Sequence, residues 1–300
     1  MTTPNLFFLS CLRLLGHQNW IRFGLRDRIL RFFCNPDTAG AMNFEIEFFG
    51  FQYKGTLSNF IDWHVYFFGA YEKANLMFLR KLIDRKVAPT FLDVGANIGQ
   101  HSLFMSRYCG QIHAFEPWDP VRIKLEEKIR INQIKNITVH PLGFGAKDAK
   151  LLYFAPIGAN LGTGSFIASH SPDNNRASST LQVVNGDSYL ANLDLTEVNL
   201  IKIDVEGFEK YVLAGLKATL KKYKPIVFME YSDATRQSFS DEAEIRSLLP
   251  EGYLIKRVSC DRKWFFFFNK SNCQLEESFF DMPGGDILLF PAEVAESLNF

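Results

Sequence analysis

Carboxylates stand at the ends of three apolar segments, where side chains of this type can bind a ligand or accept a proton. The segments are residues 91–99 (FLDVGANIG), 112–117 (IHAFEP) and 201–209 (IKIDVEGFE). Each begins with an apolar, partly β-branched run, which is typical of a buried strand, and then reaches an acid. The carboxyl ends of parallel strands share one edge of a sheet, and open α/β folds bind ligands at that edge. The pattern therefore indicates an enzyme with a nucleoside cofactor.

The first segment has the sequence of a strand that turns into a helix around a ligand. Asp93 ends the strand, and Gly95 and Gly99 permit a tight turn and a close backbone approach. Asn97 stands where a dinucleotide fingerprint has its second glycine. A cofactor without phosphates tolerates an Asn there, and S-adenosylmethionine, which carries an ammonium, a sulfonium and a ribose, is such a cofactor. A turn with only a structural role is the alternative.

Glu116 ends the second segment, seventeen residues after Gly99. A carboxylate at this position can accept hydrogen bonds from both ribose hydroxyls, because it offers two oxygens to two adjacent donors. The competing interpretation is an exposed acid before Pro117 at a helix N-terminus, where negative charge is favourable. Together with Asp93 and the glycine turn, Glu116 favours ribose binding.

The rest of the chain predicts the elements that must position these acids. Strands alternate with helices, which indicates an α/β fold with a mostly parallel sheet and helices on both faces. We expect strands at 90–94, 111–115, 136–140, 150–155, 181–184, 199–203 and 225–230, and helices at 98–108, 119–132 and 207–223. A helix near 241–249 and antiparallel edge strands at 253–258, 263–268 and 286–290 complete the sheet.

Three regions are expected along the chain. Residues 1–40 are an N-terminal helical extension, residues 41–88 hold a cap hairpin and a lead-in helix, and residues 89–300 are the catalytic core. A stretch rich in Gly, Ser and Asn at 158–179 is a candidate mobile loop over the site, with a plain surface loop equally compatible.

Amino-acid composition limits the kinds of partner and the cellular environment that we expect for this chain. Thirty-three basic and thirty-three acidic residues cancel, which argues against nucleic acid and favours a small or uncharged substrate. The five cysteines are odd in number, scattered and without a CxxC pair. We therefore expect a reduced, cytoplasmic chain with neither a disulfide framework nor a zinc site.

The N-terminal region resembles neither a signal peptide nor a membrane-spanning segment. No basic stretch precedes its leucines, Arg13 interrupts them, and no window supplies the roughly 20 apolar residues of a spanning helix. Between residues 20 and 33 apolar side chains alternate with four arginines, Arg22, Arg26, Arg28 and Arg31. This segment is either a helix packed on the protein with its arginines in water, which we favour, or a basic amphipathic helix in peripheral contact with a membrane.

Taken together, these motifs resemble the FkbM-type methyltransferases, a branch of the class I S-adenosylmethionine-dependent enzymes. The resemblance rests on DVGANIG, FEP and IKIDVEGFE, on KPIVFME at 224–230, and on GAYE at 69–72 and NLG at 160–162. It covers roughly residues 50–232. It implies a Rossmann-like class I fold and methyl transfer to a hydroxyl oxygen of a sugar, a glycan or a polyketide-like small molecule.

The resemblance also implies roles for individual residues. The cofactor is expected to be held by Asp93, Gly95, Asn97, Gly99 and Glu116, with Glu72 closing over its methionine end. Asp204 and Glu206 are the candidate catalytic residues, and Asn160 and Glu209 are the candidate substrate contacts.

Methyl transfer is an in-line displacement, so alignment supplies much of the catalysis, but a hydroxyl acceptor must also lose its proton. Mutual repulsion among three acids within residues 204–209 is a way to raise the pKa of one of them, and Asp204 is the first choice of base, with Glu206 second. The same acids have competing roles: binding the cofactor ammonium, coordinating a divalent cation, or, for Glu206 and Glu209, capping a helix. No residue is assigned as a metal ligand.

Two other functions stay open. A nicotinamide-dependent oxidoreductase uses a related fold, but its dinucleotide-binding fingerprint requires a glycine at position 97. A non-catalytic scaffold would bind the cofactor without turnover, and the intact acids at Asp93, Glu116 and Asp204 argue against it.

Overall fold

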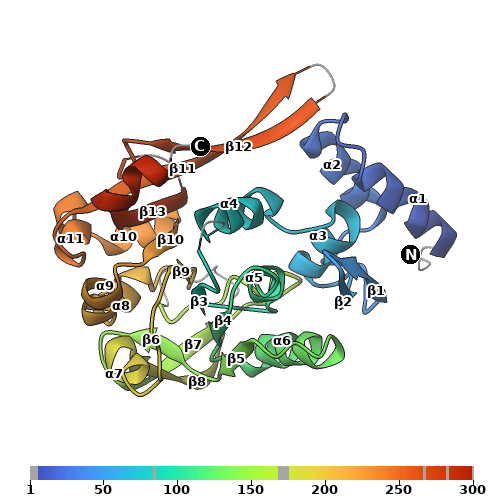
Figure 1. Cartoon of the computed structure of the whole chain (residues 1–300). Helices are drawn as coiled ribbons and strands as arrows, with labels where there is room; N and C mark the ends of the chain where they lie inside the picture. Colours follow the sequence, from blue (N-terminus) through green and yellow to red (C-terminus); the bar gives the residue numbers. More distant parts are fainter. Residues whose placement is uncertain (1–5, 84–85, 168–175, 266–267, 282–283, 299–300) are drawn as a thin grey trace. The chain divides into compact units, whose positions relative to one another are not determined.

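The computed structural model describes residues 6–83, 86–167, 176–265, 268–281 and 284–298 (Figure 1). The chain divides into two compact units. The amino-terminal unit holds Met1–Asn75, Ile157–Leu161 and Cys260–Asn272, and the core unit holds Leu76–Pro156, Gly162–Ser259 and Cys273–Phe300. The boundaries expected near residues 40 and 88 are not boundaries of this division, so the three-region division stays a prediction.

The main sheet has eight strands in the order β12-β11-β13-β10-β9-β3-β4-β5. Strands β10, β9, β3, β4 and β5 run parallel, whereas β13 is antiparallel to both β10 and β11. The strand bounds are β3 Thr90–Val94, β4 Gln111–Phe115, β5 Ile137–His140, β9 Leu200–Ile203, β10 Ile226–Tyr231, β11 Tyr253–Phe265, β12 Phe268–Glu276 and β13 Gly285–Pro291. The predicted α/β class, with its mostly parallel sheet and antiparallel strands on one side, is confirmed.

The order of the parallel strands positions the site. The strand order reverses between β3 and β9, and open α/β sheets bind ligands at such a switch point, outside the carboxyl ends of the strands. Both strands are buried along their whole length, as expected for central parallel strands with near-continuous apolar runs. Asp93 near the end of β3, Glu116 after β4 and Asp204 after β9 therefore lie toward one edge of the sheet.

Shorter elements complete the core unit. A second sheet has the order β6-β8-β7, in which β8 is parallel to β6 and antiparallel to β7. These elements are β6 Gly143–Gly145, β7 Ala149–Ala155, β8 Arg176–Asn185, α4 Lys73–Ile83, α5 Gln100–Met105, α6 Asp119–Ile131, α7 Gly186–Leu190, α10 Asp233–Ser238, α11 Glu242–Ser247 and the 3-10 helix η2 Ala292–Leu298. The first three residues of α4 belong to the amino-terminal unit.

Two expected elements differ in the structure. The helix predicted over 207–223 is two helices, α8 Glu209–Ala214 and α9 Lys217–Tyr223. The break falls at Gly215, where a Cβ would lie 2.0 Å from the carbonyl oxygen of Gly145, so only glycine fits this close backbone approach. The strands predicted at 253–258 and 263–268 are instead the long strand β11 followed by β12.

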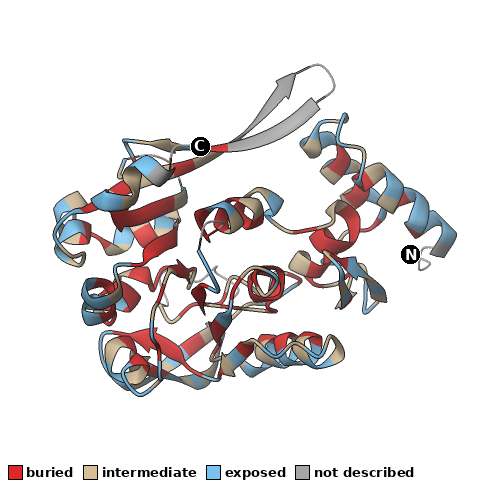
Figure 2. Cartoon of the chain, in the orientation of Figure 1, coloured by how far each residue is buried: buried red, intermediate tan, exposed pale blue. Residues whose placement is uncertain are grey.

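The amino-terminal unit has its own apolar core. Its elements are α1 Leu6–Gly16, α2 Phe23–Phe33, β1 Asn43–Phe48, β2 Phe51–Thr56 and α3 Phe60–Phe68. Trp63 and Phe67 of α3 are fully buried, and Trp63 Nε1 donates to the carbonyl of Cys34 at 2.7 Å. Most of the α3 ribbon is coloured as buried in Figure 2. Arg26 is buried too and donates to the carbonyl of Gly16, so the expectation that all four arginines of this region lie in water is wrong for Arg26.

The structure also corrects the expectation of a chain without a disulfide. Cys260 and Cys273 are disulfide-bonded, whereas Cys11, Cys34 and Cys109 are free. The two bonded residues lie on β11 and β12, which are neighbours in the sheet, and their separation in sequence gave no sign of that proximity. Within the described ranges, no helix is long and apolar enough to cross a membrane.

Candidate active site

The turn after β3 is left-handed at three positions. Gly95, Asn97 and Gly99 have φ angles of +80°, +51° and +82°. A Cβ on Gly95 would lie 1.9 Å from the carbonyl oxygen of Asp204, so only glycine fits there without displacing the backbone. Asn97 tolerates its conformation, which is a known property of Asn, and its Oδ1 accepts a hydrogen bond from the backbone of Ile98 at 2.7 Å. This turn therefore contacts the loop after β9 directly.

Asp93 holds the turn from inside the protein. Its side chain is fully buried, and Oδ2 accepts a hydrogen bond from Ser102 Oγ at 2.6 Å. Oδ1 lies 3.6 Å from the ammonium of Lys202. Since Asp93 has no exposed surface, its side chain acts on a ligand through the residues that it positions.

Lys202 is the cation at the centre of the site. It lies in β9, is buried, and its Nζ is 3.0 Å from Asp204 Oδ2 while donating to the carbonyl of Gly95 at 3.2 Å. With the Asp93 contact, Lys202 links β3, the turn and the end of β9. The sequence signal for Lys202 was a single charged residue inside an apolar strand, and it received no role from the sequence.

Glu116 ties the end of β4 to the turn. Oε2 accepts from the backbone N–H of Asn97 and Oε1 from that of Trp118, both at 2.9 Å. Burial raises the pKa of Glu116 to about 7, although these hydrogen bonds and Lys202 act in the opposite direction. Each oxygen of a carboxylate has a further lone pair, so the geometry leaves Glu116 able to accept hydrogen bonds from a diol.

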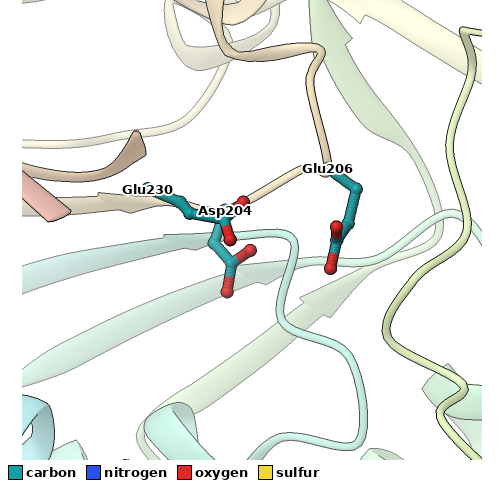
Figure 3. A group of neighbouring side chains, drawn as sticks. All are labelled: Asp204, Glu206 and Glu230. Carbon is teal, nitrogen blue, oxygen red and sulfur yellow. The ribbon is translucent and has the colours of Figure 1, made fainter. Parts of the chain in front are cut away.

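Three acids converge at the ends of β9 and β10: Asp204, Glu206 and Glu230 (Figure 3). One carboxylate oxygen of each lies within 4.8 Å of the others, and all three side chains are partly exposed. We call this group the acid trio. Asp204 and Glu206 were predicted as site residues. Glu230 was not predicted as a site residue. The available signal was its position as the acid at the end of the KPIVFME segment.

Glu230 has the most perturbed environment of the trio. Burial raises the pKa of Glu230 well above its usual range, and the negative charges of Asp204 and Glu206 raise it further. Its Oε2 atom is buried and accepts no hydrogen bond from the described part of the chain. An oxygen in that state accepts readily from a hydroxyl or, once protonated, donates to one.

Glu209 fixes the loop that carries Glu206. Its carboxylate is buried, and Oε1 accepts from the backbone N–H groups of Val205 and Gly207 at 2.9 and 3.3 Å. Oε2 accepts from Thr235 Oγ1 at 2.8 Å. Burial raises the pKa of Glu209 to about 7. With its oxygens engaged inside the protein, Glu209 has the geometry of a positioning residue, and the substrate contact expected for it stays a prediction.

Residues 162–167 also contact the site. Ser165 is buried and its Oγ donates to the carbonyl of Glu206 at 2.8 Å. Phe166 packs on Tyr153 with ring centroids 5.5 Å apart, and Tyr153 packs on Trp118 at the same distance. Burial and the charges of Glu116 and Glu206 raise the pKa of Tyr153. Part of the predicted mobile loop thus contacts Glu206, residues 168–175 lie outside the described residues, and residues from 176 onward form β8.

Glu72 and Asn160 belong to the amino-terminal unit. Glu72 precedes α4 and adopts a left-handed φ of +46°, and its Oε2 accepts from Asn75 Nδ2 at 3.3 Å. The roles expected for Glu72 at the cofactor and for Asn160 at the substrate stay predictions.

The switch point between β3 and β9, the left-handed glycine turn and the acids at the ends of β4, β9 and β10 define a Rossmann-like fold of the class I methyltransferase type. A family model described as the methyltransferase FkbM domain matches residues 93–255, which is just over half of the 300 residues. The chain belongs to this family, as its motifs predicted.

Curated relatives match over shorter ranges. "Methyltransferase 1" of Beauveria bassiana is 31% identical over 144 residues, which is 42% of this chain and 57% of the relative. "Hexuronic acid methyltransferase AglP" of Haloferax volcanii is 26% identical over 170 residues, 56% of this chain and 64% of the relative. The chain therefore spans less than two thirds of the length of either protein.

Solved structures show a weak likeness. The structure of methyltransferase FkbM from Methylobacillus flagellatus KT has a TM-score of 0.41 and 16% identity, covering 68% of this chain and 44% of that chain. The O-methyltransferase TomG from Streptomyces achromogenes, solved in complex with SAM, has a TM-score of 0.43 and 11% identity, covering 74% and 81%.

Proposed function

We propose that this chain transfers a methyl group from S-adenosylmethionine to a hydroxyl oxygen of a sugar, a glycan or a polyketide-like small molecule. The observation that carries the proposal is the acid trio beside the glycine turn, since Gly95 packs against the carbonyl of Asp204. A cofactor on the turn and an acceptor on the trio would then be neighbours. Membership of the FkbM family supports methyl transfer as the reaction.

The cofactor is proposed to lie against the turn at Gly95, Asn97 and Gly99. Glu116 would accept hydrogen bonds from the two ribose hydroxyls, because its oxygens are already oriented by the backbone N–H groups of Asn97 and Trp118. Asp93 acts indirectly, through Lys202 and the turn. When bound, the cofactor supplies an electrophilic methyl group on a sulfonium.

Asp204 is proposed to accept the proton of the acceptor hydroxyl. Its side chain is 37% exposed, whereas that of Asp93 is fully buried, so Asp204 is the one of these two Lys202 partners that an acceptor can reach. The hydroxyl proton would pass to Asp204 as the acceptor oxygen takes the methyl group, with S-adenosylhomocysteine as the neutral leaving group. Glu206 is the second candidate for this role, and Glu230 is proposed to orient the hydroxyl.

A divalent cation is the second role proposed for the acid trio. Hard cations such as Mg²⁺ and Ca²⁺ prefer carboxylate oxygens, and the spacing within 4.8 Å together with the unpartnered Oε2 of Glu230 fits such an ion. Asp204, Glu206 and Glu230 would hold it, and its charge would acidify the acceptor hydroxyl. Methyl transfer measured with EDTA and then with added Mg²⁺ separates this role from a metal-free proton transfer.

Calorimetric titration with S-adenosylmethionine, S-adenosylhomocysteine and NADH tests the cofactor. We expect the two adenosyl ligands to bind and NADH not to bind. Preferential binding of NADH would overturn the proposal in favour of an oxidoreductase. Binding of the adenosyl ligands without turnover on any acceptor would instead support the scaffold.

Radiolabelled methyl transfer tests the reaction on a panel of hydroxylated acceptors that includes hexuronic acid glycosides. In Asp204→Asn we expect kcat to fall by about 10²–10⁴-fold, the usual contribution of a general base. The dissociation constant for S-adenosylmethionine should stay within about twofold of wild type, because Asn preserves the shape of the side chain. Unchanged kcat in this variant would remove Asp204 from the chemistry.

A further inference from the structure

The first two helices present a set of large apolar side chains to water. Phe32 is 82% exposed and Phe7 is 77% exposed. We define the apolar patch as the exposed residues of this kind on the two helices: Phe7, Phe8 and Leu14 on α1, and Leu25, Phe32 and Phe33 on α2. Apolar side chains gathered in this number on one surface mark an interaction site.

The patch joins both helices. The rings of Phe8 and Phe33 meet edge to face with centroids 5.4 Å apart, and Phe33 meets Phe32 in the same way at 4.9 Å. Phe7 and Leu14 are seven residues apart on α1, so they lie on one side of that helix, and Leu25 and Phe32 repeat the spacing on α2. The opposite sides of these helices contribute Leu9, Leu12 and Leu30 to the buried core.

The charge of this region differs from that of the chain. Residues 6–35 contain five arginines and one aspartate, a net charge of +4, whereas the whole chain is neutral. Arg26 is buried, and Arg31 pairs with Asp27 and lies over the ring of Trp63.

Two arginines have exposed side chains, one directly before α2 and one within it. Arg22 and Arg28 are exposed. Arg28 lies on the patch side of α2, three residues after Leu25 and four before Phe32. The outer side of α2 therefore combines apolar side chains with a cationic head group.

We propose that α1 and α2 bind the surface of a membrane that contains anionic lipids. The apolar patch enters the boundary between head groups and acyl chains, and Arg22 and Arg28 contact lipid phosphates. Eleven residues in each helix are too few to span a bilayer but suit helices that lie in its interface. The proposal goes beyond the methyltransferase function and does not depend on it.

Charge complementarity selects this occupant over a second copy of the chain. Two copies that met through the patch would bring two regions of net charge +4 together, which is unfavourable, whereas an anionic bilayer attracts the same region. The exposed Trp20, which lies between the two helices, is of the residue type that concentrates at membrane interfaces.

Co-sedimentation of the full chain with phosphatidylcholine vesicles, with and without about 30% phosphatidylserine, tests the proposal. The patch variant is Phe7→Ser/Leu14→Ser/Phe32→Ser, and the matched control is Val87→Ser/Ile123→Ser/Leu152→Ser. The control removes three exposed apolar side chains from the core unit. Both variants should fold, because the substituted side chains are exposed, and circular dichroism checks this.

Wild type and the control variant should bind the anionic vesicles, and binding should weaken between about 50 and 300 mM NaCl. The patch variant should lose at least about tenfold in affinity, because three apolar side chains no longer leave water. Arg28→Gln should lose about fivefold, the worth of one cation near an anionic surface.

Three results would overturn the proposal. They are absence of binding by wild type, an equal loss in the control and patch variants, and a dimer in solution that the patch variant abolishes. Because no cofactor or acceptor is present, an inactive enzyme would leave the result unaffected, and failure to bind vesicles would leave the methyltransferase proposal intact.

Discussion

The ammonium of Lys202 lies 3.0 Å from Asp204 Oδ2, which joins a buried residue of β9 to an acid at the edge of the sheet. The same ammonium is 3.6 Å from Asp93 Oδ1. Lys202 thus lies between the carboxylate of Asp93 in β3 and that of Asp204, which directly follows β9. A cation enclosed in this way stabilises the site as long as both acids are present, and its loss leaves their charges uncompensated.

Lys202→Met should therefore destabilise the protein. Removing one partner of a buried ion pair costs about 3–5 kcal/mol, measured as the free energy of unfolding in urea. The double variant Asp93→Asn/Lys202→Met should recover part of this loss, because the buried acid is no longer charged. If the loss of stability in the double variant equalled the sum of the losses in Lys202→Met and Asp93→Asn, the Asp93–Lys202 contact would contribute nothing.

Glu116 should make cofactor binding depend on pH. Its pKa is raised to about 7, so below that pH the carboxyl binds a proton and loses capacity to accept hydrogen bonds from the ribose. We expect the affinity for S-adenosylmethionine to fall by up to about tenfold for each pH unit below 7. Titration calorimetry between pH 5.5 and 8.5, about one and a half units either side of that pKa, measures the effect.

The matched variant for this prediction is Glu116→Gln, whose side chain does not titrate. It should bind the cofactor more weakly than wild type at pH 8, and its affinity should not change with pH. If the variant kept the pH dependence of wild type, another group would be responsible.

The parallel strands of the main sheet could be predicted from the sequence because each of them is encoded locally. Strands β3 and β4 match the predicted ranges to the residue, since apolar runs that end in an acid or at a glycine mark both ends of a buried parallel strand. The glycine turn, Glu116 and Asp204 follow from the same segments. Their positions in the fold could be predicted because they depend on neighbours in the chain, whereas their roles stay predictions.

The rest depends on contacts between distant segments. Glu230 joins the acid trio only because β10 pairs with β9, and Lys202 matters only because β3 brings Asp93 alongside. The requirement for glycine at position 215, between α8 and α9, comes from the carbonyl of Gly145, seventy residues earlier. A single sequence holds no record of such pairings, so these features appeared only in three dimensions.

Gly95→Ala should separate steric exclusion from backbone strain. An L-residue in the left-handed region costs roughly 1–2 kcal/mol, and Gly252→Ala should show only this cost, because Gly252 has a φ of +82° with no atom within 4 Å of the added Cβ. At Gly95 the Cβ would lie 1.9 Å from the carbonyl of Asp204, which adds roughly 1–3 kcal/mol or displaces the loop. Urea unfolding and cofactor titration of both variants measure the difference. Equal losses in stability with intact binding would mean that the turn can move freely away from Asp204.

Glu209 should weaken the fold as pH rises. Its folded pKa of about 7 lies above the ordinary 4.5, so the stability that the protonated carboxyl contributes is fully present below pH 4.5 and is lost as pH rises through 7. Glu209→Gln cannot ionise, and its amide oxygen can still accept from the N–H groups of Val205 and Gly207. Wild type should therefore lose stability relative to this variant, measured as the free energy of unfolding, as pH rises from 5 to 8 across the pKa of about 7.

Glu209→Ala provides the contrast for the same measurement. It removes the acceptor of three hydrogen bonds, from Val205, Gly207 and Thr235. The donors on Gly207 and Thr235 are buried, and each costs about 1–3 kcal/mol when left without a partner. The Ala variant should lose stability at every pH, together with methyl transfer, because the loop that carries Glu206 is no longer held. A Gln variant as unstable as the Ala variant would show that the negative charge of Glu209, rather than its hydrogen bonds, holds this loop.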